Sequence, residues 1–470
     1  MRHILKNLIS LCLLFFPLMV WAQEKPSLNN QAIDGYKGIW FTLGQFSEYG
    51  DKYSGGLGTY TAKHNPLSIY APQVNKTFFV YGGTTGPDDR YLLCMIGSYD
   101  HTTGMVSKPR VVYDKKGVDD PHDNPSLSID DKGYLWVFVS GRGRSRPGFI
   151  YRSSAPYSTA SFELISEEEM TYPQPKYVSG KGFLHLFTKY TGIRELYFET
   201  SPDGNQWTED KKLAGIRRDG DKQSGHYQVS GEHGGKVVFF FNWHPNGNVD
   251  LRTNLYYLQT TDFGKTWTTI DGSPLQTPIS EVNSPALVKD YFSMNKNVYL
   301  KDVEFDKNGN PVALYVIGTG HQPGPKNGMR EWFLATYNGN VWEHHKIAES
   351  DQNYDSGSLF IDGSDWMVIG PTINEPQQYG AGGELVMWLS NDEGKTWEME
   401  KQLTHNSPRN HNYVRKVRNG QDPFFYFWAD GNPDKISESH LYFGNSNGEI
   451  WELPYSMEEE ESSPRKLQQN

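Results

Sequence analysis

The sequence predicts an all-β protein, a seven-bladed β-propeller of four-stranded antiparallel blades. A unit made of a polar opening strand, a Gly or Asn turn and an aromatic-rich apolar strand occurs seven times along the chain. Aromatic residues make up 14% of the chain, and 47 glycines and 27 prolines supply the turns that many short strands need. No long stretch has helical periodicity, and repetition at a period of about 50 residues is typical of a propeller.

The clearest unit opens at residues 122–127, turns at 131–133 and returns as the apolar run 134–139. The openings of all units are expected near residues 63, 122, 172, 226, 301, 354 and 411. The returning strands are expected at 77–81, 134–139, 183–187, 237–241, 312–316, 366–369 and 424–428. Residues 38–42 precede the first unit, and we expect them to pair with the last blade and close the ring.

Two segments in the outer halves of the blades match the Asp-box pattern of BNR repeats. They are residues 260–267 (TTDFGKTW) and 390–397 (SNDEGKTW). In this pattern the Asp holds a hairpin turn and the Trp packs between sheets. The boxes predict architecture, but they carry no information about activity.

Residues 1–22 have the features of a secretory signal peptide. Arg2 and Lys6 precede an apolar run that ends at Ala22. We therefore expect cleavage near Ala22 and a secreted or periplasmic protein. The mature chain would then contain one cysteine, Cys94, inside the apolar run 92–96, where burial in the core is the expected role.

The rest of the chain divides into three parts. Residues 23–35 are expected to be a polar, flexible lead-in, and residues 36–456 the propeller. Residues 457–470, which include four consecutive glutamates, are expected to form a disordered tail. The net charge of −11 argues against nucleic acid or an anionic membrane as a partner, because either would need a basic face.

Propeller geometry predicts where a site would lie. Strands in a blade are antiparallel, so the start of the innermost strand and the loop between the second and third strands share one face. The polar openings and these loops therefore surround one mouth. The candidate catalytic residues there are His122 and Tyr190, and the candidate substrate-binding residues are Arg142, Arg194, His226, Tyr227, His244 and Arg252.

Arginine begins the third strand of five blades, at residues 90, 146, 194, 252 and 330. A recurring arginine is most often a scaffold ion-pair residue. However, Arg194 and Arg252 stand near Tyr190 and His244 in loops that face the mouth. Guanidinium groups in that position would bind a carboxylate or sulfate in bidentate geometry, which predicts an anionic poly- or oligosaccharide as the partner.

His122 has two interpretations. It could be a hydrogen-bonded scaffold residue, which is the usual role of an isolated histidine at such a place. With Tyr190 and several arginines on the same face, we favour proton transfer instead. A neutral His or a Tyr would move the proton, and the arginines would stabilise the resulting anion.

Other kinds of chemistry have little support in the sequence. We expect no metal and no cofactor, because there is no His-x-x-x-His or Cys pair, and the adjacent His344 and His345 would point to opposite faces of a strand. A Ser-His-Asp hydrolase is not favoured either, because the Gly-x-Ser-x-Gly string at residues 444–448 falls in an Asp-box-like turn and not between a strand and a helix. A sialidase arginine triad cannot be assigned either, despite the Asp boxes.

Several segments of the first two blades resemble one known family. They are residues 52–60 (KYSGGLGTY), 62–66 (AKHNP), 75–83 (NKTFFVYGG), 122–125 (HDNP) and 146–148 (RPG). These segments are similar to the BNR-repeat family of seven-bladed propellers, which includes ulvan lyases and rhamnosyl-glucuronate hydrolases. The similarity extends from about residue 35 to residue 451.

The resemblance implies β-elimination at a uronic acid, which leaves a 4,5-unsaturated sugar. His122 matches the family's catalytic His and Tyr190 its Tyr, while Arg142 stands where the lyases have a second His. Elimination would occur by lyase cleavage or by a dehydratase at a chain end. One alternative is hydrolysis of a rhamnosyl-glucuronate linkage, with His64 as the catalytic residue. Another is a glycan-binding propeller without catalysis.

Overall fold

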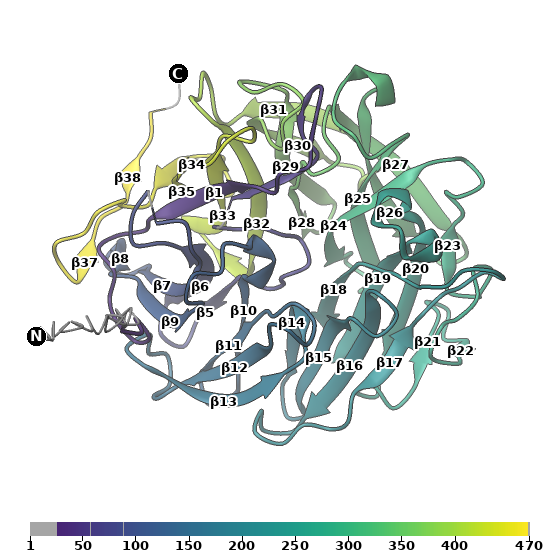
Figure 1. Cartoon of the computed structure of the whole chain (residues 1–470), viewed down its shortest axis with the longest axis horizontal. Coiled ribbons are helices and arrows are strands. Elements are labelled where there is room, and N and C mark those ends of the chain that lie inside the picture. Colours follow the sequence, from purple (N-terminus) through teal and green to yellow (C-terminus); the bar gives the residue numbers. More distant parts are fainter. Residues whose placement is uncertain (1–25, 57, 88, 469–470) are drawn as a thin grey trace, which may run out of the picture.

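The computed structural model describes residues 26–56, 58–87 and 89–468 (Figure 1). Over these ranges the chain is almost entirely strand, turn and loop, with four short 3-10 turns as its only helical segments. The all-β prediction is therefore confirmed. The expected signal peptide, residues 1–22, lies outside the described residues.

Four sheets consist of four sequential antiparallel strands each. The first has β10 (Pro125–Ile129), β11 (Leu135–Val139), β12 (Gly148–Ser153) and β13 (Phe162–Glu168). The second has β14 (Thr171–Val178), β15 (Gly182–Lys189), β16 (Glu195–Ser201) and β17 (Lys211–Ala214). The others are β24 (Asn297–Phe305), β25 (Pro311–Gly318), β26 (Arg330–Tyr337) and β27 (Trp342–Ser350), then β28 (Ser358–Asp362), β29 (Asp365–Ile373), β30 (Glu384–Ser390) and β31 (Glu398–Gln402).

Three further groups contain most of the remaining strands. One sheet begins with β18 (Gln228–His233), β19 (Lys236–Trp243) and β20 (Thr253–Thr260), and shorter strands extend it. Another contains β5 (Ser68–Ala71), β6 (Lys76–Gly83), β7 (Leu93–Asp100), β8 (Met105–Ser107) and β9 (Arg110–Asp114). The last contains β32 (Asn410–Gln421), β33 (Phe424–Gly431), β35 (Leu441–Gly444) and β36 (Ile450–Glu452). Each predicted returning strand overlaps one of these observed strands.

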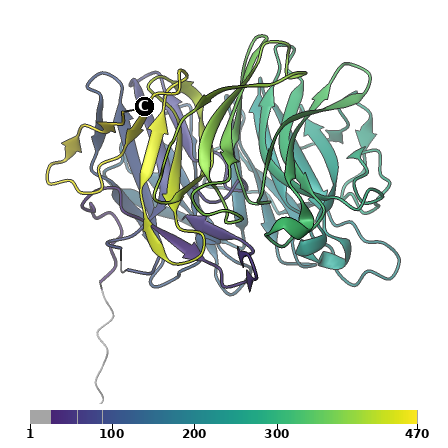
Figure 2. The same cartoon turned by 90° about the horizontal axis from the view of Figure 1, so that it is seen from above.

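The first strands of the groups lie next to one another in chain order. Contacts run from β5 through β10, β14, β18, β24 and β28 to β32, and β32 in turn pairs with β5. In Figure 1 these strands surround the middle of the molecule, and the later strands lie toward the rim. Seen at a right angle, the strands cross the thickness of the molecule, so the loops gather at two opposite faces (Figure 2). This arrangement is consistent with a β-propeller.

Apolar side chains fill the space between neighbouring sheets. Trp136, Trp332 and Trp428 are among the largest fully buried side chains. The free thiol of Cys94 is also fully buried, as expected. Burial at this density stabilises the sheets by roughly 25 cal/mol for each Å² of apolar surface removed from water. No helix within the described part of the chain is long and apolar enough to cross a membrane.

The two Asp boxes have the predicted structural role. Asp392 accepts hydrogen bonds from the backbone N–H groups of Lys395 and Thr396, at 3.1 and 2.9 Å, and so closes the turn. Asp262 binds Thr266 in the same way, at 2.9 Å. Trp267, at the end of that box, is buried against the neighbouring sheet. These turns lie in the outer part of the sheets, away from the site described below.

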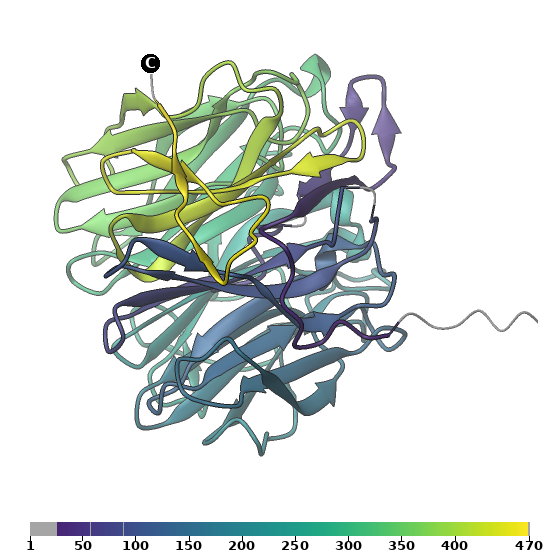
Figure 3. The ribbon, with the colours of Figure 1, turned by 90° about the vertical axis from the view of Figure 1, so that its left-hand side faces the viewer.

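The chain closes on itself through its N-terminal strand. β1 (Gly38–Thr42) pairs with β34 (Ser437–Ser439), which confirms the expected pairing with the last part of the chain. Figure 3 shows the purple N-terminal strands beside the yellow C-terminal ones. The described part of the lead-in is not flexible as expected, because Ile33 is buried and the Asn30 side chain exchanges hydrogen bonds with the backbone of Phe162.

The prediction of a disordered tail is wrong for residues 457–468. β37 (Glu461–Ser462) pairs with β8, and β38 (Arg465–Lys466) pairs with β36. Met457 is buried, and its backbone N–H donates to Asp34. Glu460 forms an ion pair with Arg110, so the acidic run meets a basic partner that composition alone could not reveal.

Candidate active site

His122 is held by the residue two positions before it. Asp120 caps the 3-10 turn Pro121–Asp123, and its carboxylate accepts from the His122 backbone N–H at 3.1 Å. The same carboxylate oxygen lies 2.5 Å from His122 Nδ1. The turn therefore places the imidazole at the start of β10, with its Nδ1 edge against a carboxylate.

The other edge of the ring meets a tyrosine. The Tyr60 hydroxyl lies 3.1 Å from His122 Nε2, and both side chains are almost completely buried. An ionised carboxylate can only accept a hydrogen bond, so Nδ1 carries the proton and Nε2 has the free lone pair. Tyr60 therefore donates to Nε2, and the three groups form a chain from Tyr60 through His122 to Asp120.

Burial favours a neutral imidazole in this chain of hydrogen-bonded groups. Burial lowers the pKa of His122, and the nearby Arg142 acts in the same direction against the opposing charge of Asp120. Burial alone would raise the pKa of Asp120, but His122 and Arg142 outweigh it and hold that pKa well below its usual range. A neutral histidine beside a permanent anion has the protonation state of a general base.

His122 lies in the wall of a basic, aromatic pocket. Three arginines and a lysine line it, and among the described residues no acidic side chain does. The lining residues are Tyr53, Tyr60, Thr61, Lys63, His122, Arg142, Tyr172, Arg194, Tyr227, Val249, Arg252 and Tyr354. The pocket is therefore positively charged inside a protein of net charge −11, and it suits an anionic ligand.

The pocket arginines come from loops before third strands and are fixed in place. Arg252 is 2% exposed and donates from Nη2 to the Tyr354 hydroxyl at 2.8 Å and from Nε to the Val249 carbonyl at 2.9 Å. Arg194 donates to the Gly247 carbonyl at 2.8 Å. Such anchoring leaves part of each guanidinium group free for a ligand carboxylate.

Tyr227 lies among these cations. Its ring centroid is 5.0 Å from the Arg252 guanidinium carbon, 5.8 Å from that of Arg194 and 5.1 Å from Lys63 Nζ. Burial would raise the pKa of Tyr227, but Arg194 and Arg252 outweigh it and lower that pKa. Tyr227 is thus the pocket phenol that most readily gives up its proton.

Comparison with known proteins agrees with this architecture. Residues 89–350, more than half of the chain, match the model of a BNR repeat-containing family. The chain belongs to the BNR repeat-containing family. The resemblance noted in the sequence is thereby confirmed.

Two comparisons connect this BNR-repeat chain to an ulvan lyase. A curated protein from Pseudoalteromonas sp. (strain PLSV), named ulvan lyase PL25, is 22% identical over 387 residues, which is 72% of this chain and 75% of that protein. A solved ulvan lyase PL25 structure superposes with a TM-score of 0.69 at 16% identity, over 88% of this chain and 95% of the other. A second structure, described as bound to -[GlcA(1-4)Rha3S]-, gives the same TM-score over 89% and 96%.

The pocket of this BNR-repeat protein brings together five of the residues singled out in the sequence: His122, Arg142, Arg194, Tyr227 and Arg252. Tyr190 lies just outside the lining. Its ring is next to Gly143, in the loop that carries Arg142, and its hydroxyl has no hydrogen-bond partner among the described residues.

Two histidines predicted to bind substrate, His226 and His244, do not line the pocket. His226 uses both ring nitrogens inside the fold, with Nδ1 2.9 Å from the Asn242 carbonyl and Nε2 accepting from the Ile216 N–H at 3.1 Å. His244 is fully buried behind Tyr227, with its Nε2 3.1 Å from Asn242 Oδ1. The sequence showed their position in the chain but not which side of the strand each side chain occupies.

His64, the alternative catalytic residue, is also fully buried. Its Nε2 lies 3.0 Å from the His122 carbonyl, and its Nδ1 accepts from the Thr61 N–H. Burial lowers the pKa of His64 to about 3, so the ring is neutral and internally satisfied. It supports His122 from behind and does not line the pocket.

Two functional candidates were missed by sequence reasoning. Asp120 could have been found, because an Asp two residues before a His at a strand opening is well placed to cap a turn and bind the ring. Tyr60 could not, because it is 62 residues from His122 and reaches it only through the fold. Of the five recurring arginines, Arg146 is a scaffold residue that binds Asp123 through two hydrogen bonds.

Proposed function

We propose that this protein is a secreted polysaccharide lyase that cleaves uronate-containing, ulvan-like glycans by β-elimination. The observation that carries the proposal is the His122 imidazole, held neutral by burial and Arg142 and oriented by Asp120, in the wall of a pocket that three arginines and, among the described residues, no acidic side chain line. The ulvan lyase relative and the glycan named for its solved counterpart support the same class of substrate. The leader-like residues 1–22 support secretion.

In this mechanism the arginines bind the uronate carboxylate. Neutralising that carboxylate acidifies the C5–H bond and stabilises the anion that forms when the proton leaves. Tyr60 relays the proton to His122: the Tyr60 oxygen takes the C5 proton as the Tyr60 hydroxyl proton passes to His122 Nε2, and Asp120 stabilises the imidazolium that forms. The C4–C5 double bond forms as the C4–O bond breaks, and the departing oxygen receives a proton from a tyrosine.

Two tyrosines can supply that proton. Tyr190 has a buried hydroxyl without a partner among the described residues, beside the Arg142 loop. Tyr227 lies inside the pocket, with its pKa lowered by Arg194 and Arg252 against the effect of burial. We assign the role to Tyr190 and treat Tyr227 as the alternative donor.

Arg142 stands where the resemblance implies a second histidine. A guanidinium group keeps its proton at any pH at which the protein is folded, so it cannot serve as a base. Arg142 lies 3.6 Å from Asp120 and lines the pocket, which suits a carboxylate clamp that is also coupled to the His122 carboxylate partner.

The fold proposal is a propeller of seven blades. It is supported by the succession of β5, β10, β14, β18, β24, β28 and β32, each in contact with the next. The hydrolase alternative is less well supported, because its candidate residue His64 is fully buried and does not line the pocket.

Product analysis tests the function. The protein is incubated with ulvan and, separately, with arabinogalactan fragments, and the products are followed by ultraviolet absorbance and mass spectrometry. A lyase gives products with an unsaturated uronate end, and a hydrolase gives saturated rhamnose. Binding without either product would leave only a glycan-binding protein and would refute the proposal.

A matched pair of variants assigns the base. His122→Ala is expected to abolish the absorbance increase, whereas His101→Ala, at a histidine far from the pocket, should leave it unchanged. His101 is a fair control because it is also partly buried and hydrogen-bonded, to Thr77 and to the Asp422 carbonyl. Equal activity of His122→Ala and wild type would remove His122 from the mechanism.

A further inference from the structure

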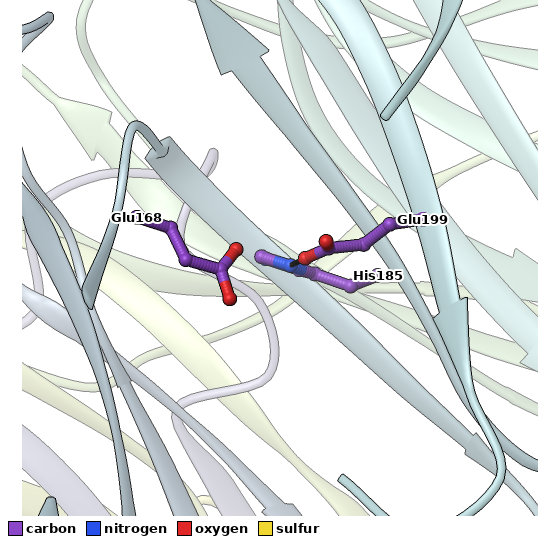
Figure 4. Close-up of side chains that lie close together, drawn as sticks. All are labelled: Glu168, His185 and Glu199. Atoms are coloured by element: carbon purple, nitrogen blue, oxygen red, sulfur yellow. Dashed lines mark hydrogen bonds and ion pairs between the residues drawn. The ribbon is translucent and has the colours of Figure 1, made fainter. Parts of the chain in front are cut away.

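Three side chains of metal-ligand type meet where two sheets face each other, outside the pocket. Glu168 ends β13, His185 lies in β15 and Glu199 lies in β16. One ligand atom from each residue lies within 4.8 Å of the other two. Figure 4 shows the Glu168 carboxyl group directed across the gap toward His185 and Glu199.

The strand register creates half of this cluster. His185 and Glu199 are directly opposite each other on the paired strands β15 and β16. Opposite residues in an antiparallel pair point to the same face of the sheet, so both side chains face β13 of the neighbouring sheet. His185 Nδ1 lies 2.8 Å from Glu199 Oε1.

The cluster has two carboxyl groups but no cationic partner. Glu199 is 2% exposed, and among the described residues neither it nor Glu168 forms an ion pair with a lysine or arginine. The nearby Lys189 is paired with Asp210 instead. Two facing carboxyl groups without a cation are costly away from water.

The imidazole supplies a nitrogen ligand. The ring is fully buried against Phe138 and Phe187, with ring centroids 4.8 Å away in each case. Its Nε2 atom has no hydrogen-bond partner among the described residues, so the present polar contacts leave the side chain incompletely satisfied.

We propose that Glu168, His185 and Glu199 bind one divalent transition-metal ion, with Zn²⁺ as the best match. An imidazole with two carboxylates suits Zn²⁺ and its neighbours, whereas Ca²⁺ and Mg²⁺ prefer all-oxygen sites. Two carboxylates would balance the charge of the ion. A water molecule can complete the coordination on the side of Glu168, the least buried of the three.

The ion would act as a structural link between two sheets. It would join β13 to β15 and β16 next to the loop that carries Tyr190. The following residue, Glu169, already accepts a hydrogen bond from the Tyr190 backbone N–H at 3.4 Å and pairs with Arg144. None of the three ligands lines the pocket, so no step of the sugar chemistry passes through the ion.

Metal content and thermal stability test the site. Tag-free full-length protein is stripped with EDTA, incubated with Zn²⁺ or Ca²⁺ and desalted. We expect about one retained Zn²⁺ per chain by mass spectrometry and a higher Tm with Zn²⁺, and neither effect with Ca²⁺. Glu199→Gln should lose both. Glu384→Gln should keep both, because Glu384 is equally buried at 2% exposure and its carboxylate accepts hydrogen bonds from Ser407, far from the cluster in the sequence.

Cobalt provides an independent readout on the wild-type protein. Co²⁺ bound by an imidazole and carboxylates gives visible d–d absorption, which Zn²⁺ should displace. The half-buried Glu168→Gln should weaken this signal even if Glu199→Gln does not fold. Folded wild-type protein that retains no Zn²⁺ and shows no Co²⁺ band would overturn the proposal. So would equal Zn²⁺ retention by the wild type and both cluster variants, which would indicate adventitious binding.

Discussion

His122 Nδ1 and Asp120 Oδ1 lie 2.5 Å apart, and the two residues are separated by a single proline. This hydrogen bond fixes the tautomer and orientation of the imidazole, with Nε2 turned toward Tyr60. The base of the proposed reaction is thus arranged before any substrate arrives, by a turn of three residues.

Asp120→Asn tests the value of that arrangement. An amide can present its NH₂ group to Nδ1 and stabilise the wrong tautomer, with the proton on Nε2. We expect kcat to fall by about 10²-fold or more, which is the scale of general-base catalysis, with a smaller change in KM. Steady-state kinetics on ulvan measure both constants. A variant that changes only KM would show that Asp120 serves binding rather than base catalysis.

The pH profile should report the neutral imidazole. Because burial and Arg142 lower the pKa of His122, kcat/KM should stay high as pH falls to about 6.5, the ordinary histidine value, and decline only below it. The carboxylate of Asp120 raises that pKa, so the acid limb of Asp120→Asn should move to still lower pH. An acid limb above 6.5 in the wild type would contradict this electrostatic account.

Tyr227 should ionise unusually easily. Arg194 and Arg252 lower its pKa against the effect of burial, so one phenol should titrate below the ordinary value of about 10. Ultraviolet difference titration detects phenolate directly. The early component should be missing in Tyr227→Phe and present in Tyr190→Phe, because burial raises the pKa of Tyr190. Persistence of the early component in Tyr227→Phe would assign it to another residue.

Arg252→Lys should weaken substrate binding. The planar guanidinium group of Arg252 binds Tyr354 and Val249 and still faces the pocket. The single ammonium group of lysine cannot do both. Loss of one charge-assisted hydrogen bond costs about 1.5–3 kcal/mol, so kcat/KM should fall by roughly 10- to 100-fold. Arg330→Lys is the matched control, because Arg330 is equally buried but does not line the pocket. Equal losses in both variants would indicate a general packing defect.

Asp123 should matter for stability. Its side chain is fully buried, 2.8 Å from Lys115 and bound twice by Arg146. Asp123→Ala leaves the Lys115 ammonium buried without its anion, and we expect a loss of about 3–5 kcal/mol in the free energy of unfolding. Asp119→Ala should cost under about 1 kcal/mol, since Asp119 and its partner Arg90 are each more than half exposed. Denaturant titration distinguishes the two results.

The strand pattern could be predicted because its signal is local. Aromatic and β-branched runs bounded by Gly and Asn turns identify strands without reference to the rest of the chain, and each predicted returning strand was found. The position of residues such as Arg252 and Tyr227 at one face also followed, because antiparallel strands bring openings and loops to the same end.

What the sequence could not supply was long-range pairing. The acidic tail was predicted to be disordered because its partners, Arg110 and β8, lie some 350 residues away. The prediction placed His226 and His244 at the correct end of their strands. Both side chains are buried between sheets and therefore do not reach the pocket, and this burial depends on the neighbouring sheet. The grouping of Glu168, His185 and Glu199 depends in the same way on the approach of two sheets.

The pairing of β1 with β34 joins the N-terminal part of the described chain to its C-terminal part. Deletion of residues 457–468 would remove β37 and β38, which pair with β8 and β36 beside this junction. The ring is thus most vulnerable at its seam, and mechanical or thermal opening should begin there.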